Sequence, residues 1–292
     1  MRRRCVGIIF DLDDTLVQTS KIDRAAIRHA VTLALESSSS VDLYKSSSSA
    51  VQLVESRFAD LLKSEPFPPA EIQIDIASWR TGLWTRALSP DVDDASVKPV
   101  AKLAHDAWSA NRLDNFKFED EVAKLIKRLQ ANGYLTGVLT NGHKDVQRTK
   151  TNACGAAALF GNAQPQYLQN WSCWRLLLEV FSSVRVPFVC IGEDKVVIAG
   201  EYPEQKPHPS IFDVACKAVG AAHNNCIMVG DSYKADIAGG INAGLLATVW
   251  VRPQAEGSMA HDIVTEVPTG QPPPTHTVRS VLELEAVLEK IG

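Results

Sequence analysis

Three of the four residues from Asp11 to Asp14 are acidic, and they follow directly on the apolar run Val6–Phe10. If this run is a buried strand, Asp11 and Asp13 lie at its carboxyl end, the side on which α/β sheets build their sites. Carboxylates this close together repel one another unless a cation or the charge of a substrate balances them. The stretch therefore indicates a catalytic or metal site, with an ordinary acidic turn as the alternative.

Two further predicted strands end in polar residues. The run Leu135–Leu139 is followed by Thr140 and Asn141, whose hydroxyl and amide groups suit the binding of an anion. The run Cys226–Val229 ends shortly before Asp231, and a carboxylate at such a position is a typical ligand of Mg²⁺. The Asn-Gly signal is weak on its own, because this dipeptide is also common in turns.

One lysine and one more carboxylate complete the candidates. Lys206 lies in the segment Gln205–Pro209, directly before a helical run, where its ammonium group can point at a phosphate, although a lone loop lysine is usually just solvated. Asp236 lies on or near the start of another predicted helix, which continues through Gly239 and Gly240. These glycines do not open a helix after a strand, so they indicate close packing of helix against strand rather than a nucleotide-binding loop.

The elements that position these residues alternate between strands and helices. Helical patterns cover Glu121–Asn132 and Ser280–Ile291, the second behind a capping box formed by Ser280 and Glu283. This alternation predicts an α/β fold with a doubly wound, Rossmann-like parallel sheet. Five short apolar runs predict its strands: Val6–Phe10, Leu135–Leu139, Val196–Ala199, Cys226–Val229 and Leu245–Val251.

A helical insert interrupts this pattern. Strand signals disappear from about residue 20 to residue 116, and helical periodicity dominates, as in Asp23–Glu36. We therefore expect a helical cap domain over residues 19–116 and a catalytic core formed by residues 1–18 and 117–292. Serine tracts at 37–40 and 46–49 are typical of a surface loop. Residues 161–194 show no clear period and are expected to form an irregular insertion in the core.

Composition limits the classes of partner. The 292 residues are 45% hydrophobic and carry a formal net charge of −4, which favours a small-molecule substrate over nucleic acid. The basic start Met1–Arg4 precedes an apolar run that is too short for a signal or a membrane-spanning segment. The six cysteines form no C-x-x-C pair, which predicts reduced thiols in a cytoplasmic protein. The oligomeric state is left open.

The candidates resemble the signature motifs of a known enzyme superfamily. Four groups of residues, in this order, resemble those of the haloacid-dehalogenase superfamily: Asp11 to Thr15, Thr140-Asn141, Lys206, and Asp231 with Asp236. The helical insert after the first motif matches the position of the cap domain in many members. The dehalogenases of this superfamily lack the second aspartate of the first motif. Asp13 is present here, so the resemblance implies phosphoryl chemistry.

The resemblance implies a role for each motif. Mg²⁺ would be the cofactor, held by Asp11, the backbone carbonyl of Asp13 and Asp231. Asp11 would be the nucleophile that forms an aspartyl-phosphate, with Asp13 as general acid and base. Asp236 would orient Lys206 or a metal-bound water. The phosphate would be bound by side chains or backbone N–H groups of the following residues: Leu12, Asp13, Thr140, Asn141 and Lys206.

Longer stretches are similar to the N-acylneuraminate-9-phosphatases of this superfamily, among them Leu139–Gly142, Lys206–Phe212 and Asp236–Gly244. This similarity implies that the chain dephosphorylates N-acylneuraminate 9-phosphate to free sialic acid. The alternatives are a phosphoglycolate or sugar phosphatase, a sugar phosphomutase, and an inactive phosphate-binding relative. Three cap residues match the family and are candidates for substrate specificity: Arg80, Thr81 and Trp84.

The chain departs from this family at one place. Members pass almost directly from the equivalent of Phe160 to that of Val196, whereas this chain interposes roughly thirty residues, far more than a usual connection. Such an irregular stretch is expected from a retained intron in a gene model. A segment of this size beside the Lys206 loop could displace that lysine. Sequencing of the transcript tests this hypothesis of a retained intron. A messenger RNA that contains the segment would reject it.

Overall fold

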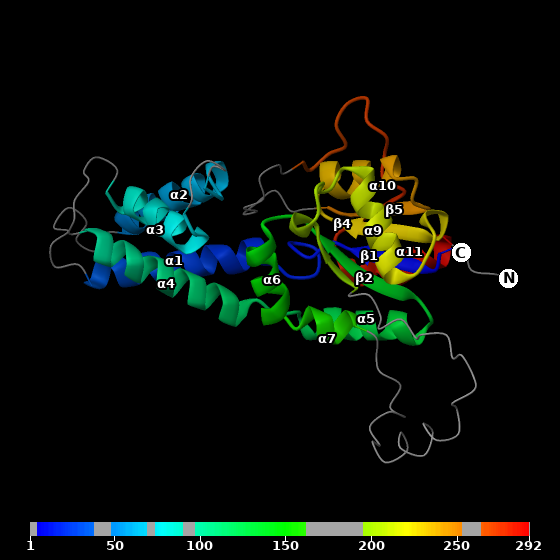
Figure 1. Ribbon diagram of the computed structural model, residues 1–292, viewed down its shortest axis with the longest axis horizontal. Coiled ribbons are helices and arrows are strands. Elements are labelled where there is room, and N and C mark those ends of the chain that lie inside the picture. The colour runs from blue at the N-terminus through cyan, green and yellow to red at the C-terminus, as the bar shows by residue number, and fades with distance from the viewer. Residues whose placement is uncertain are drawn as a thin grey trace, which may run out of the picture.

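The computed structural model describes residues 5–37, 48–68, 74–89, 97–161, 195–252 and 264–291. Figure 1 shows two parts, a bundle of helices and an α/β part with helices on both sides of a sheet. The helix α6 (Lys144–Ala153) lies at their junction. Most of the two serine tracts, and the predicted irregular insertion from residue 162 onward, lie outside the described residues.

Within the described residues, six strands form one parallel sheet in the order β3-β2-β1-β4-β5-β6. The five apolar runs all form strands, as predicted. The sixth strand was not predicted, because its three residues are too few to show a pattern. The strands are β1 (Gly7–Phe10), β2 (Leu135–Thr140), β3 (Val196–Ile198), β4 (Cys226–Gly230), β5 (Ala247–Val251) and β6 (His276–Val278).

The strand order reverses beside β1. The chain runs outward from β1 through β2 to β3 and then returns to place β4 on the other side of β1. In doubly wound sheets, ligands bind at such a reversal, outside the carboxyl ends of the strands. The expected fold class, a doubly wound parallel sheet with an inserted helical part, is therefore confirmed.

Helices bury both faces of the sheet. The side chains of Ile8 and Phe10 in β1 belong to one apolar cluster, together with α5 (Asp120–Ala131), α7 (Ala156–Phe160) and α11 (Leu284–Ile291). Ile9 points to the opposite face and packs in a second cluster with α9 (Pro209–Val219). Alternation of this kind, with both sides apolar, explains why the strands read as continuous hydrophobic runs.

The helical part has an apolar cluster of its own. At its centre the rings of Phe58 and Trp84 stack, with centroids 3.7 Å apart and an interplanar angle of 15°. The cap boundaries at residues 19 and 116 stay a prediction. The helices of this part are α1 (Thr19–Ser37), α2 (Ser48–Ser64), α3 (Ile76–Leu88) and α4 (Val97–Asn115).

Two local predictions are confirmed by the packing. A Cβ atom at Gly239 would come within 2.9 Å of Phe212 in α9, and one at Gly240 within 2.9 Å of Thr248 in β5. The short helix α10 (Gly239–Asn242) therefore packs closely against a strand at Gly240, as predicted, whereas Gly239 packs against a helix. The capping box of Ser280 and Glu283 is present, and it opens the helical turn that leads into α11.

Two further observations concern the cysteines and the length of the helices. Four cysteines lie within the described residues, and all four are free thiols: Cys5, Cys154, Cys216 and Cys226. The described part of the chain contains no helix that is both long and apolar enough to cross a lipid bilayer.

Candidate active site

One cavity of about 500 Å³ lies where the carboxyl ends of the strands face the helical part. Asp11 follows β1, Thr140 ends β2 and Asp231 follows β4, so the sheet brings these three residues to one edge. Lys206 reaches the same cavity from the loop before α9, and Asp236 from the helical turn Tyr233–Ala238 (η5). Residues from all four sequence motifs therefore line one cavity.

Asp11 is 7% exposed and is held by two hydrogen bonds. Its backbone N–H donates to the carbonyl of Val229 in β4 at 2.8 Å, and its Oδ1 accepts from Lys206 Nζ at 2.6 Å. Burial is the largest influence and raises the pKa of Asp11, Lys206 lowers it, and the charges of Asp236 and Asp13 raise it, so that the pKa lies at about 7. The ionised form of Asp11 thus lacks enough positive charge around it.

Lys206 uses all three hydrogens of its ammonium group inside the protein. They go to Asp11 Oδ1 at 2.6 Å, to the carbonyl of Leu139 at 2.8 Å and to Asp236 Oδ1 at 2.7 Å. Asp236 is completely buried, and its Oδ2 accepts from the backbone N–H of Ser232 at 3.0 Å. Burial lowers the pKa of Lys206, but Asp11 and Asp236 outweigh burial and raise it above 10.5. Asp236 therefore fixes a permanently charged lysine beside Asp11.

Three carboxylates could share a cation. Asp11, Asp231 and Asp236 each offer an oxygen, and these atoms lie within 4.8 Å of one another. Asp236 is already bonded to Lys206 and to a backbone N–H, which leaves Asp11 and Asp231 as ligands. Burial, followed by the charges of Asp11 and Asp236, raises the pKa of Asp231 well above its usual range. Mg²⁺ fits this donor set, because it binds one or two carboxylates and keeps several waters.

Asp13 lies in a different electrostatic environment. Its Oδ1 accepts from Thr19 Oγ1 at 2.6 Å and from Lys150 Nζ at 2.5 Å, and its Oδ2 accepts from Gln147 Nε2 at 2.8 Å. Burial raises the pKa of Asp13, but the charge of Lys150 and these hydrogen bonds outweigh burial and lower it to about 2. The two aspartates of the first motif therefore differ in the pKa of their carboxyl groups, although they are two residues apart.

Gln147 and Lys150 were not identified from the sequence. Both are buried on α6, at positions i and i+3, and therefore share one face of the helix. Gln147 also donates to Thr140 Oγ1 at 2.5 Å. The available signal was this spacing shortly after the Thr140 motif. It is a weak signal, because glutamine and lysine at helical positions are mostly exposed.

Thr140 and Asn141 are tied to their neighbours. The hydroxyl of Thr140 accepts from Gln147 and donates over a long 3.5 Å to the carbonyl of Asn141. The side chain of Asn141 forms two bonds with the backbone of Lys206, donating to its carbonyl at 2.8 Å and accepting from its N–H at 3.0 Å. Asn141 therefore holds the lysine loop against β2. Its amide keeps one further hydrogen, so contact with phosphate stays a prediction.

The backbone turns sharply after the first motif residues. Asp14 adopts φ 55°, a left-handed conformation that aspartate tolerates, and its carboxylate accepts from the backbone N–H of Ser20 at 2.8 Å. Within the described residues, the N–H groups of Leu12 and Asp13 donate no hydrogen bond. Unpaired backbone N–H donors of this kind are suited to binding the oxygens of an anion.

The structure separates the three cap candidates. Arg80 lines the cavity. Thr81 instead donates to the carbonyl of Ala77 at 2.8 Å within α3, and Trp84 lies in the apolar cluster of the helical part. Neither Thr81 nor Trp84 borders the cavity, so their part in substrate specificity stays a prediction.

Comparison with known proteins identifies the family. Residues 6–244 match the model of the haloacid dehalogenase-like hydrolases. The chain belongs to this family. Its motif residues lie at the carboxyl ends of β1, β2 and β4, so the resemblance expected from the sequence is confirmed by both the match and the fold.

Several relatives within the haloacid dehalogenase-like hydrolases are phosphatases. The N-acylneuraminate-9-phosphatases of Mus musculus and Homo sapiens are 30% and 29% identical over 288 residues, covering 99% of this chain and 95% of each relative. A glyceraldehyde 3-phosphate phosphatase of Pyrococcus furiosus is 26% identical over 86% of this chain and 82% of its own. Together with family membership, these relatives support a phosphoric monoester hydrolase.

Solved structures show the same fold. The hydrolase YfnB from Bacillus subtilis, bound to magnesium, superimposes with a TM-score of 0.56 at 19% identity, covering 98% of this chain and 100% of YfnB. A 2-haloacid dehalogenase from Pseudomonas syringae pv. Tomato gives a TM-score of 0.53 at 20% identity, covering 99% of this chain and 100% of the dehalogenase. These two structures therefore share the fold of this chain, and the fold alone does not indicate which reaction the chain catalyses.

Proposed function

We propose that the protein is a magnesium-dependent phosphomonoester hydrolase that acts through an aspartyl-phosphate on Asp11. The observation that carries the proposal is the meeting of Asp11, Asp231 and Lys206 at one edge of the sheet, in a cavity that also contains Asp13. A buried carboxylate beside a fixed lysine and an acidic partner is suited to nucleophilic attack on a phosphate.

The donor set supports the cofactor. Asp11, Asp231 and the backbone carbonyl of Asp13 would hold Mg²⁺, with Asp236 kept out of the set by its bonds to Lys206 and Ser232. When bound, Mg²⁺ supplies positive charge that neutralises the phosphate and lowers the repulsion between Asp11 and Asp231.

The two aspartates would have separate roles, with Asp11 as the nucleophile and Asp13 as the group that transfers protons. An oxygen of Asp11 attacks phosphorus, the bond from phosphorus to the leaving oxygen breaks, and Asp13 gives that oxygen a proton. In the second step water attacks the aspartyl-phosphate, Asp13 takes a proton from the water, and Asp11 and inorganic phosphate are released. Asp13 is ionised before substrate binds, since its pKa is about 2. A phosphate dianion nearby raises that pKa, so Asp13 would take up a proton from solvent as the substrate binds and pass this proton to the leaving oxygen.

The remaining polar groups would bind the phosphate oxygens. Lys206 supplies a charge, and the N–H groups of Leu12 and Asp13 supply unpaired donors. Thr140 and Asn141 stand beside them at the end of β2. Charge-assisted hydrogen bonds of this type stabilise an anion more strongly than neutral ones do.

We further propose N-acylneuraminate 9-phosphate as the substrate. The mammalian N-acylneuraminate-9-phosphatases support this choice, because their similarity extends over 99% of this chain and therefore includes the cap as well as the motifs. Substrate choice in a hydrolase with a cap depends on the residues that the cap contributes to the cavity, and Arg80, Asp23 and Arg112 are contributed in this way.

Release of inorganic phosphate by the full chain tests the proposal. Purified protein with Mg²⁺ is compared on N-acylneuraminate 9-phosphate, phosphoglycolate and hexose phosphates, with Asp11→Asn as the control. We expect a marked preference for the first substrate, abolished by the substitution. Preference for another phosphomonoester would retain the mechanism and reject the substrate. Turnover that persists in Asp11→Asn or without Mg²⁺ would reject the mechanism.

A further inference from the structure

The cap carries a buried arginine whose charge is not neutralised. Arg80, on α3, is 9% exposed, and its Nε has no hydrogen-bond partner among the residues that the structure describes. Within the described residues it forms no ion pair with a carboxylate. Buried charges are as a rule paired, because removing an ion from water without a partner is costly. An arginine left in this state at the wall of a cavity indicates an anion that arrives with a ligand.

The described neighbours of Arg80 fix the position of its guanidinium but offer its Nε no hydrogen-bond acceptor. Its guanidinium lies over two aromatic rings, 5.9 Å from the centroid of Phe67 and 5.3 Å from that of Trp108. Such stacking fixes the plane of the guanidinium but leaves the N–H groups at its edge available. Burial, and next the charge of Arg112, lowers the pKa of Arg80 to about 10, so the group remains charged at neutral pH.

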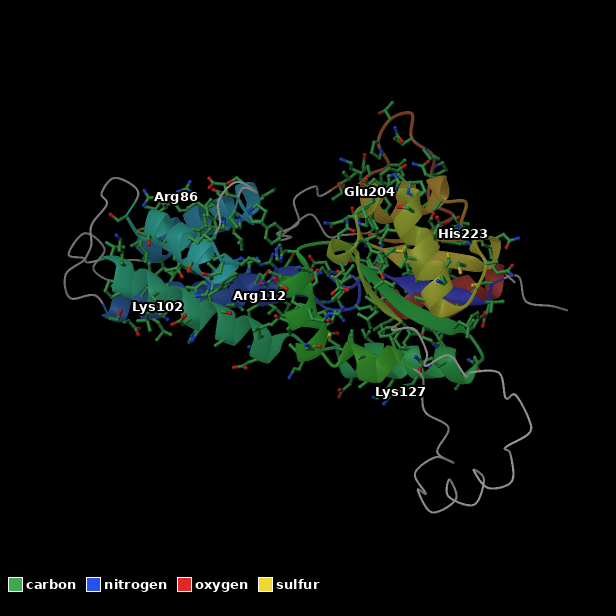
Figure 2. All side chains as sticks on the ribbon, in the orientation of Figure 1. Arg86, Lys102, Arg112, Lys127, Glu204 and His223 are labelled. Atoms are coloured by element: carbon green, nitrogen blue, oxygen red, sulfur yellow. The ribbon has the colours of Figure 1, made fainter. Side chains whose placement is uncertain are left out.

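The charge of Asp23 acts on Arg80 and raises its pKa, but the Asp23 carboxylate is already paired with another arginine. Asp23 on α1 forms a two-point ion pair with Arg112 on α4, through Nε to Oδ1 and through Nη2 to Oδ2 at 3.1 Å. Figure 2 shows Arg112 on the side of the helical bundle that faces the sheet, whereas Arg86 lies away from it. The cap side of the cavity therefore presents Lys63, Arg80 and Arg112 against one carboxylate, an excess of positive charge.

Arg80 and Asp11 line the same cavity, whose volume of about 500 Å³ is that of a site for one small organic molecule. We propose that Arg80 binds a carboxylate of the substrate, at the end of the molecule opposite the phosphate. The substrate class is then a phosphorylated sugar acid. This inference rests on the proposed function, and N-acylneuraminate 9-phosphate has the required chemistry, with a carboxylate at one end of its carbon chain and the phosphate at the other.

The test compares an acid with its neutral counterpart. The kcat/KM of the magnesium-loaded full chain is measured for N-acylneuraminate 9-phosphate, for its carboxyl methyl ester and for p-nitrophenyl phosphate. We expect Arg80→Gln to lower the acid-to-ester ratio by ~10- to 100-fold, the range for a lost charge-assisted hydrogen bond, chiefly through KM. Arg80→Lys is expected to have a higher acid-to-ester ratio than Arg80→Gln, because lysine keeps the positive charge but lacks the paired N–H donors of a guanidinium.

A matched control lies on the same helix. Arg86 is also on α3 but pairs with Glu65, at 2.7 and 2.8 Å, on the outside of the bundle. Arg86→Gln is expected to leave the acid-to-ester ratio unchanged. If Arg80→Gln lowers turnover of the acid, the ester and p-nitrophenyl phosphate by the same factor, Arg80 has a structural role and the inference is overturned.

The inference can be tested even if the proposed substrate is wrong. Should the wild type reject N-acylneuraminate 9-phosphate but cleave other phosphomonoesters, 6-phosphogluconate and glucose 6-phosphate replace the acid and its neutral counterpart. Should the wild type be inactive, the shift in Tm produced by free N-acylneuraminate is compared with that of its methyl ester. A larger shift for the acid that Arg80→Gln removes supports the carboxylate site. Equal shifts, or shifts unaffected by Arg80→Gln, refute it.

Discussion

Lys150 and Asp13 are 137 residues apart in the chain, and their side chains form an ion pair with an Nζ–Oδ1 distance of 2.5 Å. The lysine is buried, and its ammonium group also lies 5.2 Å from the centroid of the Phe116 ring. Asp13 thereby receives a positive charge from α6 that no residue of its own motif provides. The protonation state of the second motif aspartate is consequently controlled from outside the motif.

Replacing Lys150 with Met should raise the pKa of Asp13. The substitution removes the charge and the hydrogen bond that hold this pKa near about 2, whereas burial, which raises it, remains. A lowered carboxyl pKa stabilises the fold above pH 3.8, and this contribution is lost as the pH falls toward 2. The variant should therefore lose stability above pH 3.8, and the difference from wild type should shrink below it.

Carboxyl ¹³C NMR titration of the metal-free protein checks this shift, and urea unfolding checks the stability. Lys144→Met is the matched control, because Lys144 is the first residue of the same helix and is exposed. An Asp13 signal that titrates at the same pH in Lys150→Met as in wild type would show that the ion pair does not control this group.

Asp13→Asn should separate the two chemical steps. The p-nitrophenolate group leaves without help from an acid, so the first step with p-nitrophenyl phosphate should proceed in this variant. Hydrolysis of the aspartyl-phosphate needs a base and should be slowed by ~10²- to 10⁴-fold, the usual contribution of a general base. Stopped-flow absorbance should show a burst of about one p-nitrophenolate per active site. A linear trace with no burst at a strongly reduced rate would place Asp13 in the first step for every leaving group.

The sequence was sufficient for the sheet and for the residues that end its strands. Apolar runs mark five strands because both faces of a parallel sheet are buried, and each run that ends at the site is followed by a polar motif residue. The sequence alone could thus assign Asp11, Thr140 and Asp231 to one edge of the sheet. This inference needs only that the strands are parallel, which the alternation of strands with helices predicts.

Contacts made by long side chains could not be predicted in the same way. In the sequence, Lys150 and Gln147 look like ordinary exposed helix residues. Only their burial in the structure distinguishes them from such residues. Arg80 was a candidate by similarity, but its lack of a partner depends on Asp23 being used by Arg112, from a different helix. Such pairings depend on how helices cross, and sequence periodicity shows which face of a helix is buried but not what it meets.

Binding of Mg²⁺ should strengthen as the pH rises through neutrality. Burial raises the pKa of Asp11 to about 7, so the metal-free protein holds a proton there below that pH. This proton stabilises the metal-free fold at low pH, and the contribution falls as the pH rises from 3.8 toward 7. Mg²⁺ must displace this proton, and the raised pKa of Asp231 acts in the same direction, so the apparent affinity should weaken as the pH drops below 7.

Thermal unfolding with and without Mg²⁺ across this pH range measures the effect. The rise in Tm on adding Mg²⁺ should be small on the acid side of neutrality and larger on the alkaline side. Removal of the metal by a chelator should return Tm to the metal-free value. Asp231→Asn should abolish the rise at every pH. A rise in Tm that is the same at acid and alkaline pH would mean that no proton is displaced.

Two glycine substitutions should change stability in opposite directions. A Cβ atom at Gly230 would lie 2.2 Å from Asp236 Oδ2 and 2.3 Å from its Cγ, so Gly230→Ala must displace the carboxylate that holds Lys206. We expect a loss of about 1–3 kcal/mol in the free energy of unfolding, as for other overpacked sites, together with reduced phosphatase activity. Gly82 is an exposed residue inside α3, and a Cβ atom added there would meet no other atom within 4 Å.

Gly82→Ala should therefore stabilise the protein by about 1 kcal/mol, the helix-propensity difference between the two residues. Urea unfolding of both variants measures the two changes, and phosphate release shows whether activity follows Gly230→Ala and not Gly82→Ala. Because both substitutions add one methyl group, Gly82→Ala shows whether an added methyl group away from Asp236 affects activity. If Gly230→Ala kept wild-type stability and activity, Asp236 would have room to move without releasing Lys206, and its role in fixing that lysine would have to be abandoned.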